Sequence, residues 1–257
     1  MSELNANSNS QAQKYIEVQI KRQEREDAPT RWETFQIRWR PNLNVIACLQ
    51  DIQAHPTTSE GKATTPVAWD CACLEEVCGA CSMLINGRPR QACTALVDKL
   101  EKPIRLEPFT KFPLVRDLMV DRSRMFDHLK QVKAWVNIDG TYELGPGPTY
   151  SQTLALERYK LSECFTCGCC LEACPQYGPS SPFIGPQAIS QVRLFNSHPT
   201  GEMNAEERLE GVMGTGGVQD CGDAQNCVKV CPKQIPLTES IGVVSRQASV
   251  YGFGIVF

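Results

Sequence analysis

Apolar and polar residues alternate along the N-terminal part of the chain, and this period of two predicts β-strands. Apolar side chains occupy every second position over residues 16–20 and again over residues 35–39. A charged loop separates the two stretches, so we predict a hairpin. From residue 44 to residue 53 the apolar positions follow helical spacing instead, which predicts a short helix.

A second hairpin and a closing strand follow. Residues 82–85 predict a strand, and the Asn-Gly pair at residues 86–87 predicts a hairpin turn because both residues tolerate a positive φ. Residues 104–106 predict the closing strand. These elements define a β-rich domain over residues 14–106. The polar head before it, residues 1–13, is rich in Asn and Ser, and we expect it to be disordered.

The pattern changes to helical spacing from about residue 113. In a connecting segment, residues 107–150, we expect a helix with the apolar face Phe126, Leu129, Val132 and Val136. A Gly- and Pro-rich stretch at residues 140–150 breaks this segment. The part over residues 151–257 predicts helices from about residue 151 into a cysteine-rich run, over 187–196 behind Pro186, after the candidate N-cap Asn204, and over 237–248. The predicted fold class is α+β.

Composition narrows the class of protein. The chain has 257 residues, of which 42% are hydrophobic, enough for one large or two modest domains. The formal net charge is −3 without a clustered basic excess, so we expect no nucleic-acid partner. We see neither a signal peptide nor a run of about 20 apolar residues that could span a membrane. We therefore expect a reducing, cytoplasmic setting.

Cysteines dominate the candidate chemistry. The chain has 14 cysteines, and in a reducing compartment thiolate metal ligation is a better explanation for them than disulfides. Four of them form the first motif, with the spacing Cys73-x4-Cys78-x2-Cys81-x11-Cys93. This is the spacing of plant-type 2Fe–2S ligation, so we predict a 2Fe–2S cluster held by these four residues.

Two further motifs form an internal repeat. The first copy is Cys164-x2-Cys167-x2-Cys170-x3-Cys174-Pro175, and the second is Cys221-x5-Cys227-x3-Cys231-Pro232, with Ala224 where the second cysteine of the copy would stand. The first copy is the bacterial two-cluster run, in which the fourth cysteine ligates the other cluster. Because the fourth cysteine of each copy binds the cluster of the other copy, we predict a 4Fe–4S cluster on Cys164, Cys167, Cys170 and Cys231. This assignment leaves the second cluster with Cys174, Cys221 and Cys227. Because the methyl group of Ala224 cannot bind iron, we predict a 3Fe–4S cluster there.

The remaining thiols and imidazoles carry no predicted role. We interpret Cys48 as a core residue and Cys71 and Cys169 as thiols that are not ligands. The three histidines, His55, His128 and His198, do not neighbour a cysteine run, so a Rieske centre is not expected. A structural zinc module is the competing interpretation, but three closely spaced ligands followed by Cys-Pro do not suit one tetrahedral ion.

Together the motifs resemble a known family, the iron–sulfur subunit of succinate dehydrogenase and fumarate reductase. The resemblance covers roughly residues 14–245 and rests on the segments WDCACLEEVCGACSMLINGRPRQACTAL, CFTCGCCLEACP, FIGP and CGDAQNCVKVCP. It implies an N-terminal plant-type ferredoxin domain with the β-grasp fold and a C-terminal helical domain like the bacterial ferredoxins. It also implies electron transfer through the 2Fe–2S, 4Fe–4S and 3Fe–4S centres.

The resemblance implies partners at both ends of this path. A flavoprotein subunit with covalent FAD would oxidise succinate, and a membrane anchor subunit, with haem b as its expected cofactor, would bind the quinone. The chain itself would be peripheral, on the cytoplasmic face of the cell membrane. Fumarate reduction with the same cofactors and a free ferredoxin-like carrier are the alternatives. The apolar tail, residues 250–257, either contacts a partner or packs on its own core.

The resemblance also bears on the quinone. Family members that use ubiquinone typically carry a Trp after the first Cys-Pro pair and a His directly after the first cysteine of the third motif. Here residues 175–179 contain no Trp, and Gly222 follows Cys221. We therefore expect menaquinone, with Pro175, Gln176 and Gly222 as candidates to line the approach to the 3Fe–4S centre.

Overall fold

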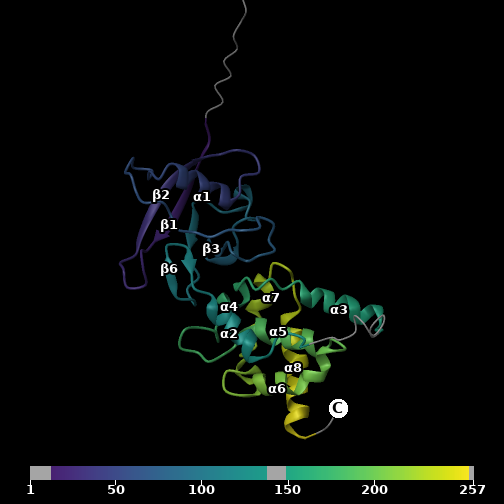
Figure 1. Cartoon of the computed structure of the whole chain (residues 1–257). Helices are drawn as coiled ribbons and strands as arrows, with labels where there is room; N and C mark the ends of the chain where they lie inside the picture. The colour runs from purple at the N-terminus through teal and green to yellow at the C-terminus, as the bar shows by residue number, and fades with distance from the viewer. Residues whose placement is uncertain (1–12, 138–148, 255–257) are drawn as a thin grey trace, which may run out of the picture.

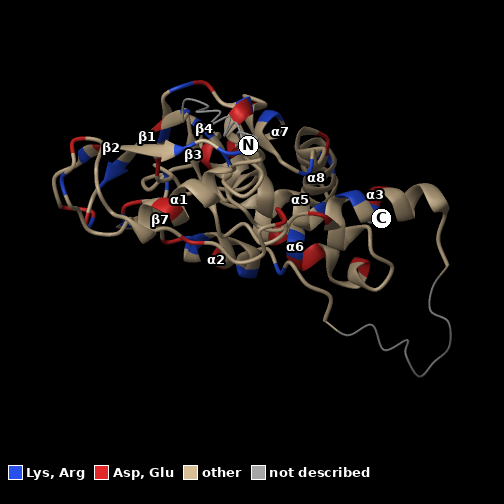
Figure 2. Cartoon of the chain, turned by 90° about the horizontal axis from the view of Figure 1, so that it is seen from above, with Lys and Arg blue, Asp and Glu red and all other residues tan. Residues whose placement is uncertain are grey.

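The computed structural model describes residues 13–137 and 149–254. Figure 1 shows two halves, a domain built around the N-terminal strands and a domain of helices that ends at the C-terminus. Most of the polar head and of the Gly- and Pro-rich stretch at residues 140–150 falls outside the described residues. Figure 2 shows acidic and basic residues interspersed along the ribbon of both halves rather than gathered on one of them.

A mixed five-stranded sheet with the order β2-β1-β5-β3-β4 forms the first half. The strands are β1 (Tyr15–Arg22), β2 (Arg31–Arg38), β3 (Ser82–Ile85), β4 (Arg88–Gln91) and β5 (Ile104–Glu107). β1 is antiparallel to β2 and parallel to β5, and β3 is antiparallel to both β4 and β5. The predicted strands and hairpins are confirmed, and the turn residues Asn86 and Gly87 have φ values of 51° and 74°.

The predicted helix is α1 (Val45–Ala54), and it packs against this sheet. Asn44 is its N-cap: the side-chain Oδ1 accepts a hydrogen bond from the backbone N–H of Ala47 at 2.9 Å. The same side chain donates from Nδ2 to the carbonyl oxygen of Cys93 at 2.9 Å. One asparagine therefore both begins the helix and holds the cysteine loop beside it.

The segment that follows departs from the predicted helix. It begins with a small hairpin, β6 (Leu114–Arg116) and β7 (Met119–Val120), and only then forms α2 (Ser123–Gln131). The predicted apolar face is only partly correct, because Val132 is buried as predicted but Phe126 is 52% exposed and Val136 lies beyond the helix. Met125 and His128 are buried instead, one position before the predicted Phe126 and Leu129. The domain boundaries at residues 106 and 150 stay predictions.

In the described residues of the second half the chain forms six helices: α3 (Gln152–Ser162), α4 (Cys169–Glu172), α5 (Gly185–Asn196), α6 (Ala205–Met213), α7 (Asn226–Val230) and α8 (Leu237–Gly252). Short 3-10 turns occur at Val97–Lys99, Gly201–Asn204 and Val218–Asp220. Figure 1 shows α5 in the middle of this domain, and it packs against α8. The predicted α+β class, with a β-grasp domain followed by an all-α domain, is confirmed.

Two details of the helices differ from expectation. Asn204 precedes α6 as predicted, but its side chain does not cap the helix; Nδ2 donates instead to the Glu207 carboxylate at 3.1 Å. The last helix continues to Gly252, four residues beyond the predicted end, because Tyr251 still packs against the core. Of the apolar tail, Phe253 is 83% exposed, and residues 255–257 lie outside the described part.

Buried ion pairs and hydrogen bonds join the connecting segment to both halves. Arg22 of β1 donates from Nε to Oδ1 of Asp117 at 3.0 Å, and both side chains are 1% exposed. On the other side, Glu172 of α4 accepts from the backbone N–H groups of Thr110 at 2.9 Å and Lys111 at 3.1 Å. Removing either acid would leave buried donors unpaired, which is costly. These contacts fix the sheet relative to the cysteine-rich helices.

Candidate metal centres

The loop before β3 holds the first cysteine motif and directs backbone N–H groups at its sulfurs. The N–H groups of Glu75 and Val77 point at Cys73 Sγ at 3.3 and 3.4 Å, and the N–H of Ala80 points at Cys78 Sγ at 3.4 Å. Left-handed residues interrupt the loop at Leu74, Glu76 and Gly79. Alternation of this kind forms concave nests of N–H donors that favour anions. The donors lower the pKa of the Cys73 thiol to about 7.

The other two cysteines of this motif lie deeper. Cys81 precedes β3 and Cys93 follows β4, and they are 3% and 6% exposed. Burial raises the pKa of Cys93 to about 12, and the thiol of Cys81 beside it acts in the same direction. The hairpin therefore carries Cys81 and Cys93 toward the loop with Cys73 and Cys78, and the structure brings together the four residues of the first motif.

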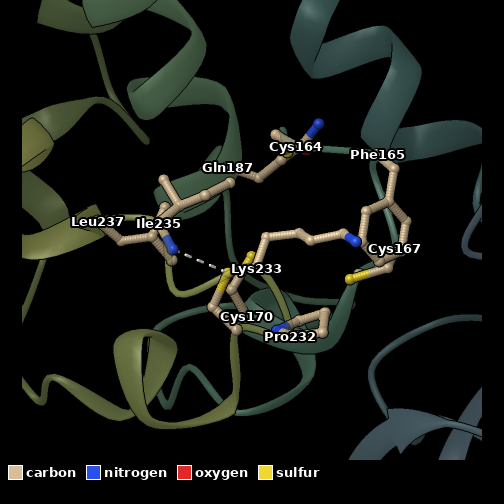
Figure 3. A pocket seen from close by; sticks show the side chains of 11 residues that line it. Cys164, Phe165, Cys167, Cys170, Gln187, Pro232, Lys233, Ile235 and Leu237 are labelled. Atoms are coloured by element: carbon tan, nitrogen blue, oxygen red, sulfur yellow. Dashed lines mark hydrogen bonds between the residues drawn. The ribbon is translucent and has the colours of Figure 1, made fainter. Parts of the chain in front are cut away.

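The second site is a pocket in the helical domain. Its lining includes the four predicted 4Fe–4S ligands, Cys164, Cys167, Cys170 and Cys231. Figure 3 shows the side chains of Cys164, Cys167 and Cys170 around the pocket, with the Lys233 side chain extending across it toward Phe165. The backbone N–H of Ile235 donates to Cys231 Sγ at 3.4 Å. Four cysteines separated by up to 67 positions in the chain thus share one cavity.

Backbone geometry and burial shape this second site. Thr166 and Gly168 have φ values of 54° and 84° and turn the chain between the cysteines. Burial raises the pKa of Cys164 to about 11, and that of Cys170 also lies well above its ordinary value. Gln187 lines the cavity with a buried Oε1 that has no hydrogen-bond partner in the described residues. Turning that amide over puts an N–H donor in place of Oε1, and an N–H donor suits a sulfur acceptor.

The third site is a second pocket in the helical domain. Cys174, Cys221 and Cys227 line it, and so does Ala224. The three candidate quinone residues, Pro175, Gln176 and Gly222, line the same cavity. A Cβ on Gly222 would lie 2.4 Å from Gln176 Nε2, so glycine is what allows this close approach. The three residues that the sequence suggested for the quinone approach therefore lie together at the third cysteine site.

The first and second sites are in contact. A Cβ on Gly79, in the first motif, would lie 2.8 Å from Cys167 Cα in the second. Arg122 donates to the carbonyl oxygen of Gly79 from the other side. Leu84 of β3 lies in the hydrophobic core of the helical domain. The cysteine loop of the sheet domain therefore rests on the backbone of the helical domain.

The donor set fits iron–sulfur clusters. Thiolate is the soft ligand that such clusters use, and hydrogen bonds to sulfur are part of how proteins bind and tune them. Within residues 13–137 and 149–254, no three His, Cys, Asp or Glu side chains converge on a point that a single metal ion would occupy. Instead, seven of the cysteines line the two cavities.

Of the three other cysteines, one has contacts that the sequence did not suggest. Cys48 is a buried residue of the N-terminal core, and burial raises the pKa of its thiol to about 12. Cys71 is half-buried beside the first motif. Cys169 is fully buried and accepts a hydrogen bond from Gln91, a residue of β4 that sequence reasoning missed. The two lie 78 positions apart, so no local pattern could have connected them.

Comparison with known proteins agrees with the division into two cluster domains. A 2Fe–2S iron–sulfur cluster binding domain matches residues 17–127, and a 4Fe–4S dicluster domain matches residues 160–235. The chain is 58% identical over 241 residues to the succinate dehydrogenase iron–sulfur subunit of Bacillus subtilis, covering 94% of this chain and 95% of that protein. It is 33% identical over 234 residues to the fumarate reductase iron–sulfur subunit of Mycobacterium tuberculosis, covering 90% of each.

The chain belongs to the iron–sulfur subunit family of succinate dehydrogenase and fumarate reductase. A chain of the Mycobacterium smegmatis Sdh1 complex in the apo form has the same fold, with a TM-score of 0.77 and 20% identity over 94% of this chain and 98% of that one. The predicted cofactors, 2Fe–2S, 4Fe–4S and 3Fe–4S clusters, are confirmed by the matched domains and the family. Among the helices of the described residues, none has the length and apolar character to cross a membrane.

Proposed function

We propose that this subunit transfers electrons from succinate oxidation, at a partner flavoprotein, to a quinone at a membrane anchor subunit. The observation that carries the proposal is the order of the cysteine sites, the last of which has Ala224 in place of a fourth ligand. The identity of 58% to a succinate dehydrogenase subunit supports the direction of oxidation. The flavoprotein contributes the substrate site and its FAD, and the anchor contributes the quinone site and any haem b.

The ligand assignment follows the three sites. Cys73, Cys78, Cys81 and Cys93 hold the 2Fe–2S cluster. Cys164, Cys167, Cys170 and Cys231 hold the 4Fe–4S cluster. Cys174, Cys221 and Cys227 hold the 3Fe–4S cluster. When bound, the clusters supply one-electron transfer; the chain's own residues hold them, direct N–H groups at the sulfurs and exclude water by burial.

The quinone end of the subunit lies at the third site. Pro175, Gln176 and Gly222 line the cavity with Ala224, so they surround the place where the anchor subunit would present its quinone. Residues 175–179 contain no Trp, and Gly222 follows Cys221. This chain therefore offers few hydrogen-bond donors for a quinone carbonyl. We therefore assign menaquinone, with more of its pocket supplied by the anchor, and a peripheral position on the cytoplasmic face of the membrane.

Fumarate reduction is the second candidate, because curated fumarate reductase subunits are also relatives of this chain. A free ferredoxin-like carrier is disfavoured by the surface beside the first motif, where Leu74 and Val77 are 51% and 53% exposed. Apolar side chains exposed around a redox centre suit a docking partner.

The test is purification of the subunit from its native membrane with whatever accompanies it. We expect a flavoprotein and an anchor subunit to co-purify, and turnover with succinate to be faster with menaquinone analogues than with ubiquinone analogues. Faster turnover with fumarate as acceptor would establish the second candidate. Faster turnover with ubiquinone would contradict the quinone assignment, and a subunit that purifies alone would contradict the function.

A further inference from the structure

Gln91, the last residue of β4, contacts two cysteine motifs at once. Its Nε2 donates to Cys169 Sγ at 3.4 Å, and its Oε1 lies 3.7 Å from Cys81 Sγ, which donates to it. Ser82 Oγ holds the same amide through hydrogen bonds of 3.0 and 3.1 Å. Gln91 and Cys169 are both 0% exposed. A buried carboxamide therefore bridges the sheet domain and the helical domain.

The bridge joins residues beside two different cluster sites. Cys81 belongs to the first motif, and Cys169 lies between Cys167 and Cys170 of the second. Gly79 makes its close approach to Cys167 in the same region. The contact is also sealed from solvent, so its hydrogen bonds act in a low-dielectric environment where they are electrostatically stronger.

Cluster binding changes which end of the amide suits which sulfur. A ligating Cys81 is a thiolate and has no proton to donate, so a carbonyl oxygen beside it would be unfavourable. The two ends of a carboxamide have nearly the same shape, and turning the group over exchanges them. Nε2 then donates to Cys81 Sγ, and Oε1 accepts the S–H proton of Cys169. Both ends of the amide keep a partner in this arrangement, in which the Cys169 proton turns from the Cys167 sulfur to Gln91 Oε1.

We propose that Gln91 is a positioning residue that donates a hydrogen bond to the Cys81 sulfur and raises the potential of the 2Fe–2S centre, with Cys169 fixing the orientation of its amide. The proposal rests on the proposed role of Cys81 as a ligand. Reduction adds a negative charge that sulfur atoms share, and an N–H dipole aimed at sulfur favours the reduced form. Cys169 thus has a role although it binds no iron.

The test is a redox titration of the assembled complex, followed by the EPR signal of the 2Fe–2S centre. Gln91→Leu keeps a similar volume but removes the donor. We expect the equilibrium constant for one-electron reduction to fall roughly threefold to tenfold, where tenfold corresponds to about 59 mV. Ser240→Ala removes buried hydrogen bonds between α5 and α8, and as a control it should leave this potential unchanged. An unshifted potential in Gln91→Leu overturns the proposal.

Cys169 variants test the bridge without changing the amide. Cys169→Ala should shift the potential in the same direction, and Cys169→Ser, which keeps an O–H donor, should restore it. In a double-mutant cycle the shifts in potential caused by Gln91→Leu and Cys169→Ala should not add, because each variant removes the same hydrogen bond between the two residues. The proposed role of the Gln91–Cys169 bridge is contradicted if the two shifts in potential add, or if Cys169→Ala keeps the native potential of the 2Fe–2S centre. Retention of a native 2Fe–2S signal in Cys81→Ala would instead refute the ligand assignment.

Discussion

Single residues decide what each cysteine site can hold. Ala224 lines the third cavity with Cys174, Cys221 and Cys227, at the position where the repeat unit carries a cysteine. Because a methyl group offers iron no ligand, one corner of a cubane has no protein donor. The type of cluster at this site therefore depends on one side chain, and so does part of its reduction potential.

Ala224→Cys should convert at least part of the 3Fe–4S centre to a 4Fe–4S centre, because it supplies the missing thiolate. The change should also lower the potential of the centre and slow quinone reduction. EPR of the oxidised complex measures the conversion as a loss of the 3Fe–4S signal. A full 3Fe–4S signal in a well-folded variant would count against the assignment of Cys174, Cys221 and Cys227.

Gly79 illustrates a different residue-level constraint, the close approach of two loops. Gly79 and Gly87 share a φ of +74°, but a Cβ on Gly79 would meet Cys167 Cα at 2.8 Å, whereas nothing lies within 4 Å of one on Gly87. Both substitutions to Ala carry the strain of a left-handed residue, about 1–3 kcal/mol. Only the substitution at residue 79 adds a backbone clash.

We expect Gly79→Ala to lower the free energy of unfolding by more than Gly87→Ala, and to reduce the content of 2Fe–2S and 4Fe–4S clusters in the purified subunit. Thermal unfolding and iron analysis measure the two effects. Equal behaviour of the two variants would show that the contact between Gly79 and Cys167 contributes nothing.

At the scale of elements, α1 supports the 2Fe–2S site through its N-cap. Asn44 accepts from Ala47 and donates to the Cys93 carbonyl. Ser151 caps α3 through a 3.3 Å bond on an exposed surface, and within the part of the chain that the structure describes its side chain does not also hold a cysteine loop. Comparing Asn44 with Ser151 therefore separates the contribution of a helix cap from that of the hydrogen bond to the Cys93 loop.

Asn44→Ala should cost about 1 kcal/mol for the lost cap and more for the lost bond to Cys93, with a measurable loss of 2Fe–2S cluster. Ser151→Ala should cost about 1 kcal/mol or less and leave all clusters in place. Denaturant unfolding and the visible absorption of the clusters give both values. Loss of cluster in both variants, or in neither, would contradict this role of Asn44.

Some helices and strands could be predicted from the sequence and others could not. Strands β1 and β2 and helix α1 have clear periodicity and were predicted close to their observed bounds. The hairpin β6–β7 was missed because three and two residues are too few to show alternation. The face of α2 was misplaced because His128, a polar residue, is buried there while Phe126 is exposed. The three cysteine motifs were recognisable because their spacing is local, and the grouping of Cys231 and Cys174 with the other motif came from the ligand exchange known for two-cluster ferredoxins.

At the scale of the whole molecule, the three cysteine sites run from the sheet domain into the helical domain, and the first site carries exposed apolar side chains. Leu74 and Val77 flank Cys73 at the surface. The Gln91–Cys169 contact, by contrast, was beyond prediction, because only the docking of the two domains brings those residues together. We therefore expect a partner subunit to dock at the exposed Leu74 and Val77. The buried Gln91–Cys169 contact instead holds the two domains of this chain together.

The double variant Leu74→Lys, Val77→Lys should keep its 2Fe–2S signal but bind the flavoprotein at least tenfold more weakly, because burying charge in place of apolar area opposes docking. Val115→Lys, which changes a valine of similar exposure, 49%, is the matched control and should bind normally. Co-purification measured by flavin content reports binding. Unchanged flavin content in the double variant would place the flavoprotein elsewhere.

One chain holds three different clusters in a succinate:quinone oxidoreductase, and EPR of the purified complex reports on each of them. We expect a 2Fe–2S signal after reduction by succinate or dithionite and a 3Fe–4S signal in the oxidised sample, with iron content matching the three sites. Absence of the 2Fe–2S signal on reduction, or of the 3Fe–4S signal on oxidation, would contradict it.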